Sequence, residues 1–289
     1  PCGNWILNPA RLPIPPSGQK RGLTNEKIIN AGNAKNTWMN PSSMLRKLQE
    51  LSTPDGYLTY AQFVECALYD PLHGYYTSNR NRVGRTPETD FYTSSSLGPL
   101  FGRLVAEAAL GLLGDAATPS SLAFIEIGAE PGCSVLDGVE HPFAETRTLR
   151  VGDRLEVTGN AVVFANEWLD AQPFHRLVLE NGKWRETGLS INDGGLSEIR
   201  LPQVSDSARP YAARLPEDLP EGYRVDVPSG ACEALQGLVA QPWKGLFLTL
   251  DYGKSLAEMT ETIPQGTARA YRNHQQSDDL AANPGEQDL

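Results

Sequence analysis

The chain has 289 residues, of which 40% are hydrophobic and 21% charged, with a formal net charge of −10. This composition is typical of a globular protein, and no run of about 18 apolar residues predicts a membrane-spanning helix. The negative charge disfavours binding to nucleic-acid phosphates and favours cationic partners. The four cysteines form no C-x-x-C pair, so neither a zinc site nor a disulfide framework is predicted.

Residues 1–40 contain five basic side chains and one acidic one and show no periodicity. We expect this segment to be disordered, or a non-native leader. A basic, acid-poor start is also found in organelle transit peptides, so a mitochondrial location is the alternative to a bacterial cytoplasmic one. Residues 41–96 predict a helical cap segment, with one helix at 43–51 and a second that starts at the capping box Thr59–Gln62.

The core is expected from residue 97 to 289. Apolar residues recur at helical spacing from Leu97 to Leu112, and Gly114 closes this helix. Three apolar runs, at 122–127, 161–165 and 246–250, resemble parallel strands that are buried on both faces. Between the last two, Asn181-Gly182 predicts a hairpin within a β-rich insertion at about 175–228.

The first of these strands runs into Glu126-Ile-Gly128-Ala-Glu-Pro-Gly132. Ligands of open α/β sheets bind beyond the carboxyl ends of the strands, and the two glycines would let the backbone approach one closely. Pro131 removes an amide donor and two glutamates are present, which suits a cation better than a pyrophosphate. The alternative is that the glycine pair forms only a tight turn.

The second strand ends in Asn166-Glu167-Trp168-Leu169-Asp170, which combines an amide, two carboxylates and an indole. Asp251 follows the third strand. Helix capping is the alternative explanation for these residues, but three acidic strand ends on one rim favour a cation-binding site. The histidines are dispersed, so no metal site is expected.

Eight sequence elements occur in the order seen in the MidA-like family of S-adenosylmethionine (SAM)-dependent methyltransferases, which is related to a mitochondrial complex I assembly factor that methylates arginine. The resemblance spans roughly residues 55 to 289. The elements are Gly74-Tyr-Tyr76, Asp90-Phe-Tyr-Thr-Ser94, Gly98-Pro-Leu-Phe-Gly102, Glu126-Ile-Gly-Ala129, Asn166-Glu-Trp-Leu-Asp-Ala-Gln-Pro173, Asp251-Tyr-Gly253, Gly266-Thr-Ala-Arg-Ala-Tyr271 with His274, and Pro284-Gly-Glu-Gln-Asp-Leu289.

The resemblance implies a Rossmann-like class I methyltransferase fold, SAM as the cofactor and a protein substrate, with arginine as the methyl acceptor. It implies catalytic roles beside the transferred methyl for Asn166, Glu167 and Asp170. The cofactor-binding residues it implies are Glu126, Gly128, Ala129, Gly132, Asp90, Phe91, Thr93, Ser94, Gly74 and Tyr75.

Three features depart from the family pattern. Glu130 stands where the family has its second loop glycine. The segment from Glu126 to Asn166 is shortened, and the acids that could bind the ribose hydroxyls in it are Asp153 and Glu156. The family also continues beyond Leu289, so we expect a C-terminally truncated chain with an open sheet edge.

The function expected is therefore methyl transfer from SAM to a protein side chain. The alternative is a methyltransferase-fold protein that has lost turnover and serves as a binding or assembly module. A nucleotide-dependent oxidoreductase is disfavoured, because the strand ends are acidic and the glycine loop is incomplete.

Overall fold

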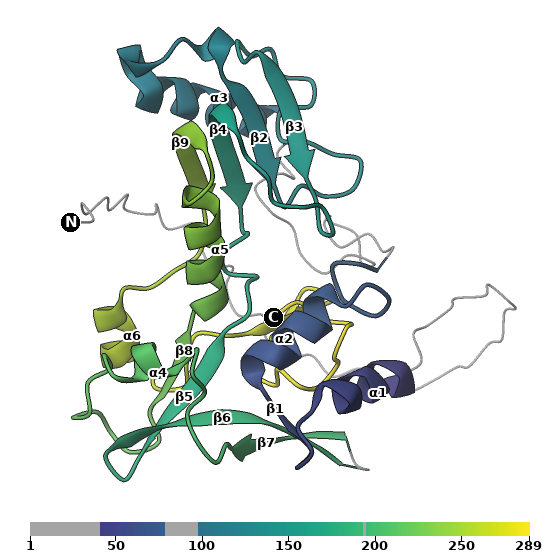
Figure 1. The fold of residues 1–289 in the computed structure, drawn as a ribbon, viewed down its shortest axis with the longest axis vertical. Coiled ribbons are helices and arrows are strands. Elements are labelled where there is room, and N and C mark those ends of the chain that lie inside the picture. Colours follow the sequence, from purple (N-terminus) through teal and green to yellow (C-terminus); the bar gives the residue numbers. More distant parts are fainter. Residues whose placement is uncertain (1–40, 79–97, 193–194) are drawn as a thin grey trace, which may run out of the picture. The chain divides into compact units, whose positions relative to one another are not determined.

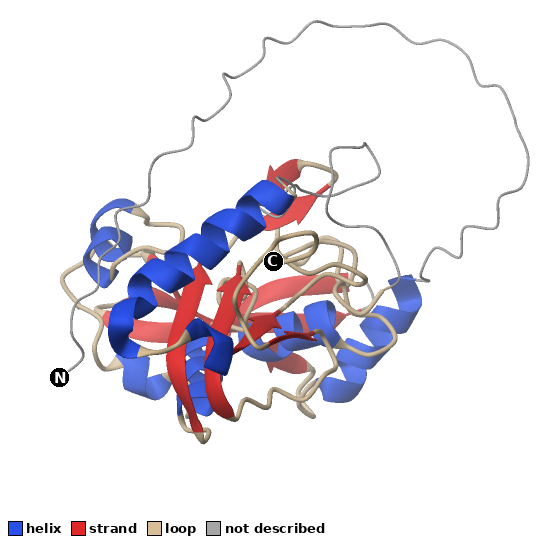
Figure 2. Cartoon of the chain, turned by 90° about the horizontal axis from the view of Figure 1, so that it is seen from above, coloured by secondary structure: helices blue, strands red, loops and turns tan. Residues whose placement is uncertain are grey.

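The computed structural model describes residues 41–78, 98–192 and 195–289 (Figure 1). The expected leader at 1–40 and the predicted site residues Asp90, Phe91, Thr93 and Ser94 lie outside the described residues. Figure 2 shows the helices and strands of the described residues, in which six strands follow one another between Ala123 and Arg200 with no α-helix between them. No helix in the described part of the chain is long and apolar enough to cross a membrane.

A four-stranded parallel sheet forms the centre of the predicted core. It comprises β2 (Ala123–Ile127), β3 (Glu145–Leu149), β4 (Gly159–Asn166) and β9 (Trp243–Leu250) in the order β3-β2-β4-β9. The three strands expected from the sequence are therefore adjacent, which brings the acidic residues that follow them to one edge.

The strand β9 differs from the expectation that it is buried on both faces. Among the described residues it pairs with β4 alone, and Leu250 is 43% exposed. The apolar run that we read as a central strand is thus an edge strand here. Periodicity cannot distinguish the two, because a partly covered edge strand carries the same short apolar run.

Helices cover the two faces of this sheet. The helix α3 (Pro99–Leu113) starts after Gly98, ends at Gly114 as predicted, and packs with Phe124 and Phe164. A Cβ atom on Gly102 would lie 2.0 Å from the carbonyl oxygen of Val135, so glycine is required for this close approach. On the opposite face, Leu238 of α5 (Ser229–Val239) packs with Ile125 and Val163.

The connection from β2 to β3, residues 128–144, contains no helix. Parallel strands are usually joined by a helical crossover. In this chain the loop itself supplies the apolar cover, since Val135, Leu136, Val139 and Phe143 pack beneath α3. The shortening noted in the sequence therefore replaces a helix with a packed loop.

A second sheet contains the predicted β-rich segment. Its strands are β1 (Tyr57–Thr59), β5 (His175–Glu180), β6 (Lys183–Asn192), β7 (Gly195–Arg200) and β8 (Arg224–Val227), in the order β1-β6-β5-β8 with β7 paired to β6. All pairs are antiparallel. The hairpin predicted at Asn181-Gly182 is confirmed, because Glu180 pairs with Lys183 and both turn residues have positive φ.

Buried charges connect neighbouring strands of this second sheet. Arg176 binds Asp226 through two hydrogen bonds of 2.7 and 3.2 Å, and both residues are 5% exposed. Asp226 also accepts a hydrogen bond from the Ala268 amide. His175 contacts the fully buried Glu186 at 2.7 Å.

The described part of the helical cap segment contains α1 (Pro41–Leu51) and α2 (Tyr60–Tyr69). The capping box of Thr59 and Gln62 is present as predicted. A core of Phe63, Tyr75, Leu189 and Leu280 ties α2 to the second sheet and to the C-terminal segment. The remaining elements are the 3-10 turns 114–116 and 119–121, α4 (Arg209–Ala212), α6 (Leu256–Thr262), β10 (Ala270–Arg272) and β11 (Gln275–Ser277).

Candidate active site

The end of β4 carries the first group of candidate residues. Glu167 follows the last strand residue, Asn166, and adopts a left-handed backbone conformation with φ of 49°. This conformation is uncommon outside glycine, and such residues cluster at functional sites. The Glu167 amide donates to the Leu250 carbonyl at 2.8 Å, which ties this turn to the end of β9.

Asp251 holds the turn that follows. One of its carboxylate oxygens accepts hydrogen bonds from the backbone amides of Trp168 at 3.1 Å and Leu169 at 2.7 Å. Helix capping is the alternative role that the sequence pattern indicates for Asp251, and this contact is of a similar kind. It fixes the backbone on which Glu167 and Asp170 are carried.

Burial and neighbouring carboxylates raise the pKa values of Glu167 and Asp170. Burial, followed by the negative charges of Asp251 and Asp288, raises the pKa of Glu167 to about 7, against a lowering hydrogen bond from Asn166. Burial and then the charges of Asp251, Asp288 and Glu167 also raise the pKa of Asp170, although this residue is among the exposed ones. We refer to Glu167, Asp170, Asp251 and Asp288 as the acidic cluster.

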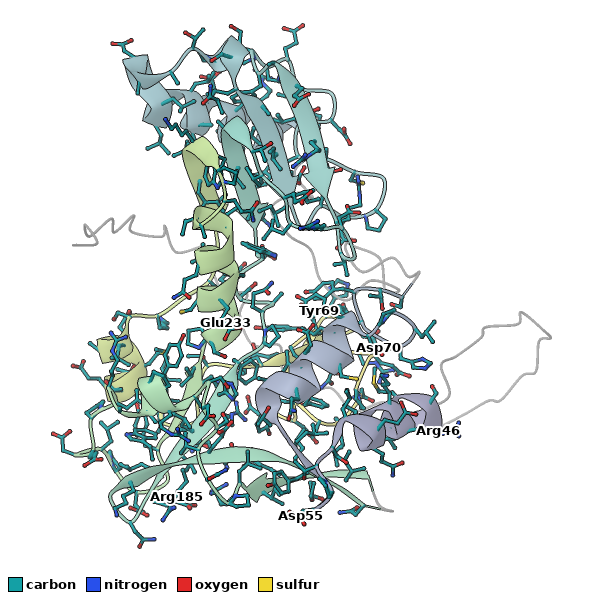
Figure 3. All side chains as sticks on the ribbon, viewed as in Figure 1. Arg46, Asp55, Tyr69, Asp70, Arg185 and Glu233 are labelled. Atoms are coloured by element: carbon teal, nitrogen blue, oxygen red, sulfur yellow. The ribbon has the colours of Figure 1, made fainter. Side chains whose placement is uncertain are left out.

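Tyrosines border the acidic cluster. Tyr69, at the end of α2 (Figure 3), donates its hydroxyl to the Ala171 carbonyl at 2.8 Å. Its ring stacks on Tyr76 with the ring centroids 5.6 Å apart, and the Tyr76 hydroxyl donates to Asp288 at 2.7 Å. Burial and the charge of Asp288 raise the pKa of both phenols, so both stay neutral hydrogen-bond donors.

The pKa shifts of Glu167 and Asp170 arise from burial and from neighbouring carboxylates. No arginine or lysine of the described residues is among the groups that shift the pKa of Glu167 or Asp170. The buried Oδ1 of Asn166 also has no hydrogen-bond partner within the described part of the chain. Half-buried carboxylates without a cation are costly, and binding a cation that donates hydrogen bonds would relieve that cost. Aromatic rings beside the cluster suit a planar guanidinium in particular.

The glycine junction beyond β2 is arranged differently. Gly128 and Gly132 both have positive φ, at 77° and 75°, as the tight turn requires. The Glu126 carboxylate accepts hydrogen bonds from the Ser134 hydroxyl and the Val135 amide, each at 2.8 Å. The predicted ligand-facing carboxylate of Glu126 is therefore engaged in holding its own loop.

Arg150, the residue after β3, binds the glycine loop. The Leu149 carbonyl accepts a hydrogen bond from the Gly128 amide at 2.8 Å, so Arg150 stands beside the glycine loop. Its guanidinium donates to the carbonyls of Glu130 at 3.3 Å and Cys133 at 3.2 Å. Asp153, a predicted ribose acceptor, instead accepts from the Arg150 amide at 2.8 Å and caps the turn.

These residues fit SAM in part. The glycine loop fits, because no atom lies within 4 Å of the position that a Cβ would take on Gly132, so a ligand can approach its backbone. The position beyond β3 does not fit as it stands, since a guanidinium offers donors only and ribose hydroxyls need an acceptor there. Glu156, the other predicted acceptor, is exposed and pairs with Arg154 at 3.1 Å.

The other predicted site residues within the described part of the chain are buried or half-buried. Tyr75 is fully buried in a core cluster, and a Cβ on Gly74 would lie 2.6 Å from the Asp70 amide nitrogen. Ala129 is buried beside Gly128 in the glycine loop. Trp168 is half-buried against Ile127 and Ala165, and its ring lies 3.7 Å from the Cβ position of Gly128. Their roles in binding stay predictions.

Sequence reasoning did not identify several residues of the site. Asp288 lies in the family element at 284–289, for which the resemblance implies no role, and no pattern marks Tyr69; both come from parts of the chain distant from Glu167. Arg150 could have been found, since it directly follows a run of alternating residues at 145–149. No group of histidine, cysteine, aspartate and glutamate among the described residues could hold a metal ion.

The chain is similar in sequence to known methyltransferases. Residues 147–289 match a family described as "Putative S-adenosyl-L-methionine-dependent methyltransferase". The mitochondrial protein arginine methyltransferase NDUFAF7 homolog of Drosophila melanogaster is 26% identical over 86% of the chain and 67% of its own length. NDUFAF7 of Xenopus tropicalis is 26% identical over 81% of the chain and 65% of its own length.

A solved structure agrees with these sequence relationships. A COG1565 superfamily member from Burkholderia thailandensis, crystallised with S-adenosyl-homocysteine, superposes with a TM-score of 0.72 at 25% identity, covering 86% of this chain and 72% of that one. The chain spans about two thirds of the length of the curated relatives it matches. The parallel sheet and these comparisons confirm the expected Rossmann-like methyltransferase fold with SAM as cofactor, and they agree with the resemblance to the MidA-like family of SAM-dependent methyltransferases.

Proposed function

We propose that the protein transfers a methyl group from SAM to an arginine side chain of a protein substrate. The single observation that carries this proposal is the acidic cluster, whose carboxylates lie beside tyrosines and have no cation acting on Glu167 or Asp170 among the described residues. The mitochondrial relatives named as protein arginine methyltransferases support it. Because the chain covers only part of their length, the acceptor is proposed from this site and from family resemblance together.

The cofactor supplies the electrophilic methyl group, and the chain has to bind and orient the acceptor. A guanidinium has its hydrogen-bond donors in a planar fork that matches a carboxylate bidentately. Glu167 and Asp170 extend from a turn that Asp251 fixes, which suits such a clamp. Alignment of the reacting groups is worth up to ~7–11 kcal/mol of a displacement barrier in favourable cases.

A methylated guanidinium must also lose a proton during transfer. Glu167 has a pKa raised to about 7, so it takes up a proton near neutral pH more readily than an ordinary carboxylate. The phenols of Tyr69 and Tyr76 stay neutral and donate to the Ala171 carbonyl and to Asp288. We assign Glu167 the role of proton acceptor and Asp170 the role of orienting the guanidinium.

A methyl-transfer assay with labelled SAM tests the proposal. The full chain is offered a basic peptide that contains arginine and the same peptide with lysine in place of arginine. We expect transfer to the arginine peptide alone, and a fall of about 10²-fold or more for Glu167→Gln, the lower end of the contribution of a general base. Glu233→Gln, an exposed glutamate on α5 (Figure 3), is the matched control.

Two results would contradict the proposal. Equal transfer to both peptides would remove arginine as the acceptor. Unchanged turnover in the Glu167→Gln protein would remove this residue from the chemistry. A well-folded protein that binds SAM but methylates neither peptide would favour the binding or assembly module considered as the alternative.

A further inference from the structure

The position of Arg150 in the sheet is the starting observation. Arg150 directly follows β3, and the last residue of β3, Leu149, pairs with Ile127 of β2. In dinucleotide-binding sheets of this kind, the residue that accepts the ribose hydroxyls lies at the end of the neighbouring strand, about 20 positions after the glycine loop begins. Arg150 stands at that place relative to Gly128.

The guanidinium of Arg150 also fastens the loop. Its Nε and Nη2 atoms donate to the carbonyl oxygens of Glu130 and Cys133, which flank Gly132, and Nη1 donates to the Thr148 hydroxyl. Arginine has five donors and no acceptor. At this place it therefore satisfies the loop carbonyls but cannot accept a hydrogen bond from a ribose hydroxyl.

The acids near this position already have partners within the chain. Asp137 accepts a hydrogen bond from the Ser134 amide at 2.7 Å. Asp153 caps the Arg150 amide, and Glu156 is exposed and paired with Arg154. Beside the loop is a hollow of about 280 Å³. Its lining includes Gly132, Ser134, Thr148, the acid Asp137 and two arginines, Arg147 and Arg150. A ligand that enters this hollow meets a cation where the ribose acceptor is expected.

We propose that Arg150 is the residue that sets cofactor affinity in this chain, keeping it low by placing a positive charge and only donors at the ribose position. The inference rests on the proposed use of SAM. SAM carries one net positive charge at neutral pH, whereas S-adenosyl-homocysteine carries none. Arg150 therefore opposes SAM more strongly than it opposes S-adenosyl-homocysteine.

Isothermal calorimetry on the full chain tests this inference. SAM and S-adenosyl-homocysteine are titrated separately into the unchanged protein and into the Arg150→Glu and Arg154→Glu proteins, at one ionic strength. Arg154 is exposed and four positions further along, so its replacement makes the same charge change away from the loop. We expect Arg150→Glu to tighten S-adenosyl-homocysteine binding about tenfold and SAM binding by more, with no change for Arg154→Glu.

Arg150→Gln provides a second variant that removes the charge and keeps a hydrogen-bond donor for the loop carbonyls. Thermal unfolding without ligand shows whether each variant is folded, and if Arg150→Glu is unfolded then Arg150→Gln decides the question. We expect Arg150→Gln to tighten binding by a smaller factor. Unchanged or weaker binding in the folded Arg150 variants, or equal tightening in Arg154→Glu, would overturn the inference.

The outcome is separable from that of the proposed function. If Arg150→Glu binds cofactor more tightly but no arginine peptide is methylated, the role of Arg150 stands and the arginine proposal fails. If the unchanged protein methylates the arginine peptide and Arg150→Glu binds cofactor more weakly, the arginine proposal stands and the role of Arg150 fails.

Discussion

The two inner strands of the parallel sheet, β2 and β4, both end beside carboxylates, but the carboxylates at the two ends have different partners. At the glycine junction, Glu126 accepts two hydrogen bonds from its own loop, and Arg150 binds the carbonyls of that loop. At the end of β4, Glu167 and Asp170 are surrounded by further carboxylates. The carboxylate at the first junction has its partners within its own loop, whereas at the second we propose that an external cation binds.

The difference shows that a carboxylate at the end of a strand can either stabilise the fold or be available to a ligand. A carboxylate that accepts backbone amides stabilises the fold and has little left for a ligand. Carboxylates that repel one another reduce stability and are ready for a cationic substrate. We therefore expect substitutions at the two junctions to change stability in different ways.

The largest stability effect is expected at the glycine junction. Glu126→Ala leaves the Ser134 hydroxyl and the Val135 amide without their charged acceptor. Each hydrogen bond to a charged group contributes about 1.5–3 kcal/mol, so we expect the free energy of unfolding to fall by about 3 kcal/mol. Urea denaturation measures it, and a loss below about 1 kcal/mol would show that the junction is not self-satisfied.

Asp251→Ala should cost less, although it also removes the acceptor of two backbone amides. Loss of its charge relieves the repulsion that acts on Asp170 and Glu167. We expect a net loss of about 1–2 kcal/mol in the same denaturation experiment. Asp251→Asn keeps an acceptor and should be nearly neutral, whereas a larger loss for Asp251→Asn than for Asp251→Ala would argue against repulsion.

The pH dependence of stability gives a third comparison. Because the folded pKa of Glu167, about 7, lies above its ordinary value of 4.5, the native state retains a proton that the unfolded state releases between these values. Stability therefore falls as pH rises through that window. We expect Glu167→Gln to be more stable than the unchanged protein by about 1 kcal/mol at pH 8, after allowance for solvent screening, and no more stable at pH 5.

Thermal unfolding across pH 5 to 8 measures this difference, with Glu233→Gln as the control. A constant offset between Glu167→Gln and the unchanged protein would mean that Glu167 does not titrate in this range. A stability gain at pH 5 that vanishes at pH 8 would reverse the sign and contradict the arrangement of the acidic cluster.

The smallest effect is expected for Ser134→Ala. It removes one of the two hydrogen bonds to Glu126 and leaves the Val135 amide in place. We expect a loss of about 1 kcal/mol in the free energy of unfolding. Thr146 lines the same hollow as Ser134 and is exposed, so Thr146→Ala should lower the free energy of unfolding by less. A larger loss for Thr146→Ala than for Ser134→Ala would mean that the Ser134 hydroxyl does not stabilise Glu126.

Much of the fold could be predicted from sequence, because local patterns carry it. The apolar runs before Gly128 and Asn166, the Asn181-Gly182 turn and the capping box of Thr59 each state a backbone conformation within a few residues. An open sheet edge is expected from the family pattern, but the apolar run at 246–250 could not show that β9 is the edge strand among the described residues, since an edge strand and a central strand share one pattern.

The candidate site could be predicted only for residues that directly follow the strands of the parallel sheet. The acids after the strands converge because parallel neighbours end at one edge. The left-handed conformation of Glu167, the approach of Asp288 and the engagement of Glu126 by its own loop depend on tertiary contacts with no local signal. For the same reason, the sequence could not show at which junction the carboxylate has its hydrogen-bond donors within its own loop.

Binding of an arginine peptide at two pH values tests the central claim most directly. If the acidic cluster is a guanidinium site in which Glu167 titrates near pH 7, calorimetry should show about tenfold tighter binding at pH 8 than at pH 6, because the carboxylate is then mostly ionised. The Glu167→Gln protein should bind more weakly and without this dependence. Binding that is equally tight at both pH values, or that persists unchanged in Glu167→Gln, would contradict the account.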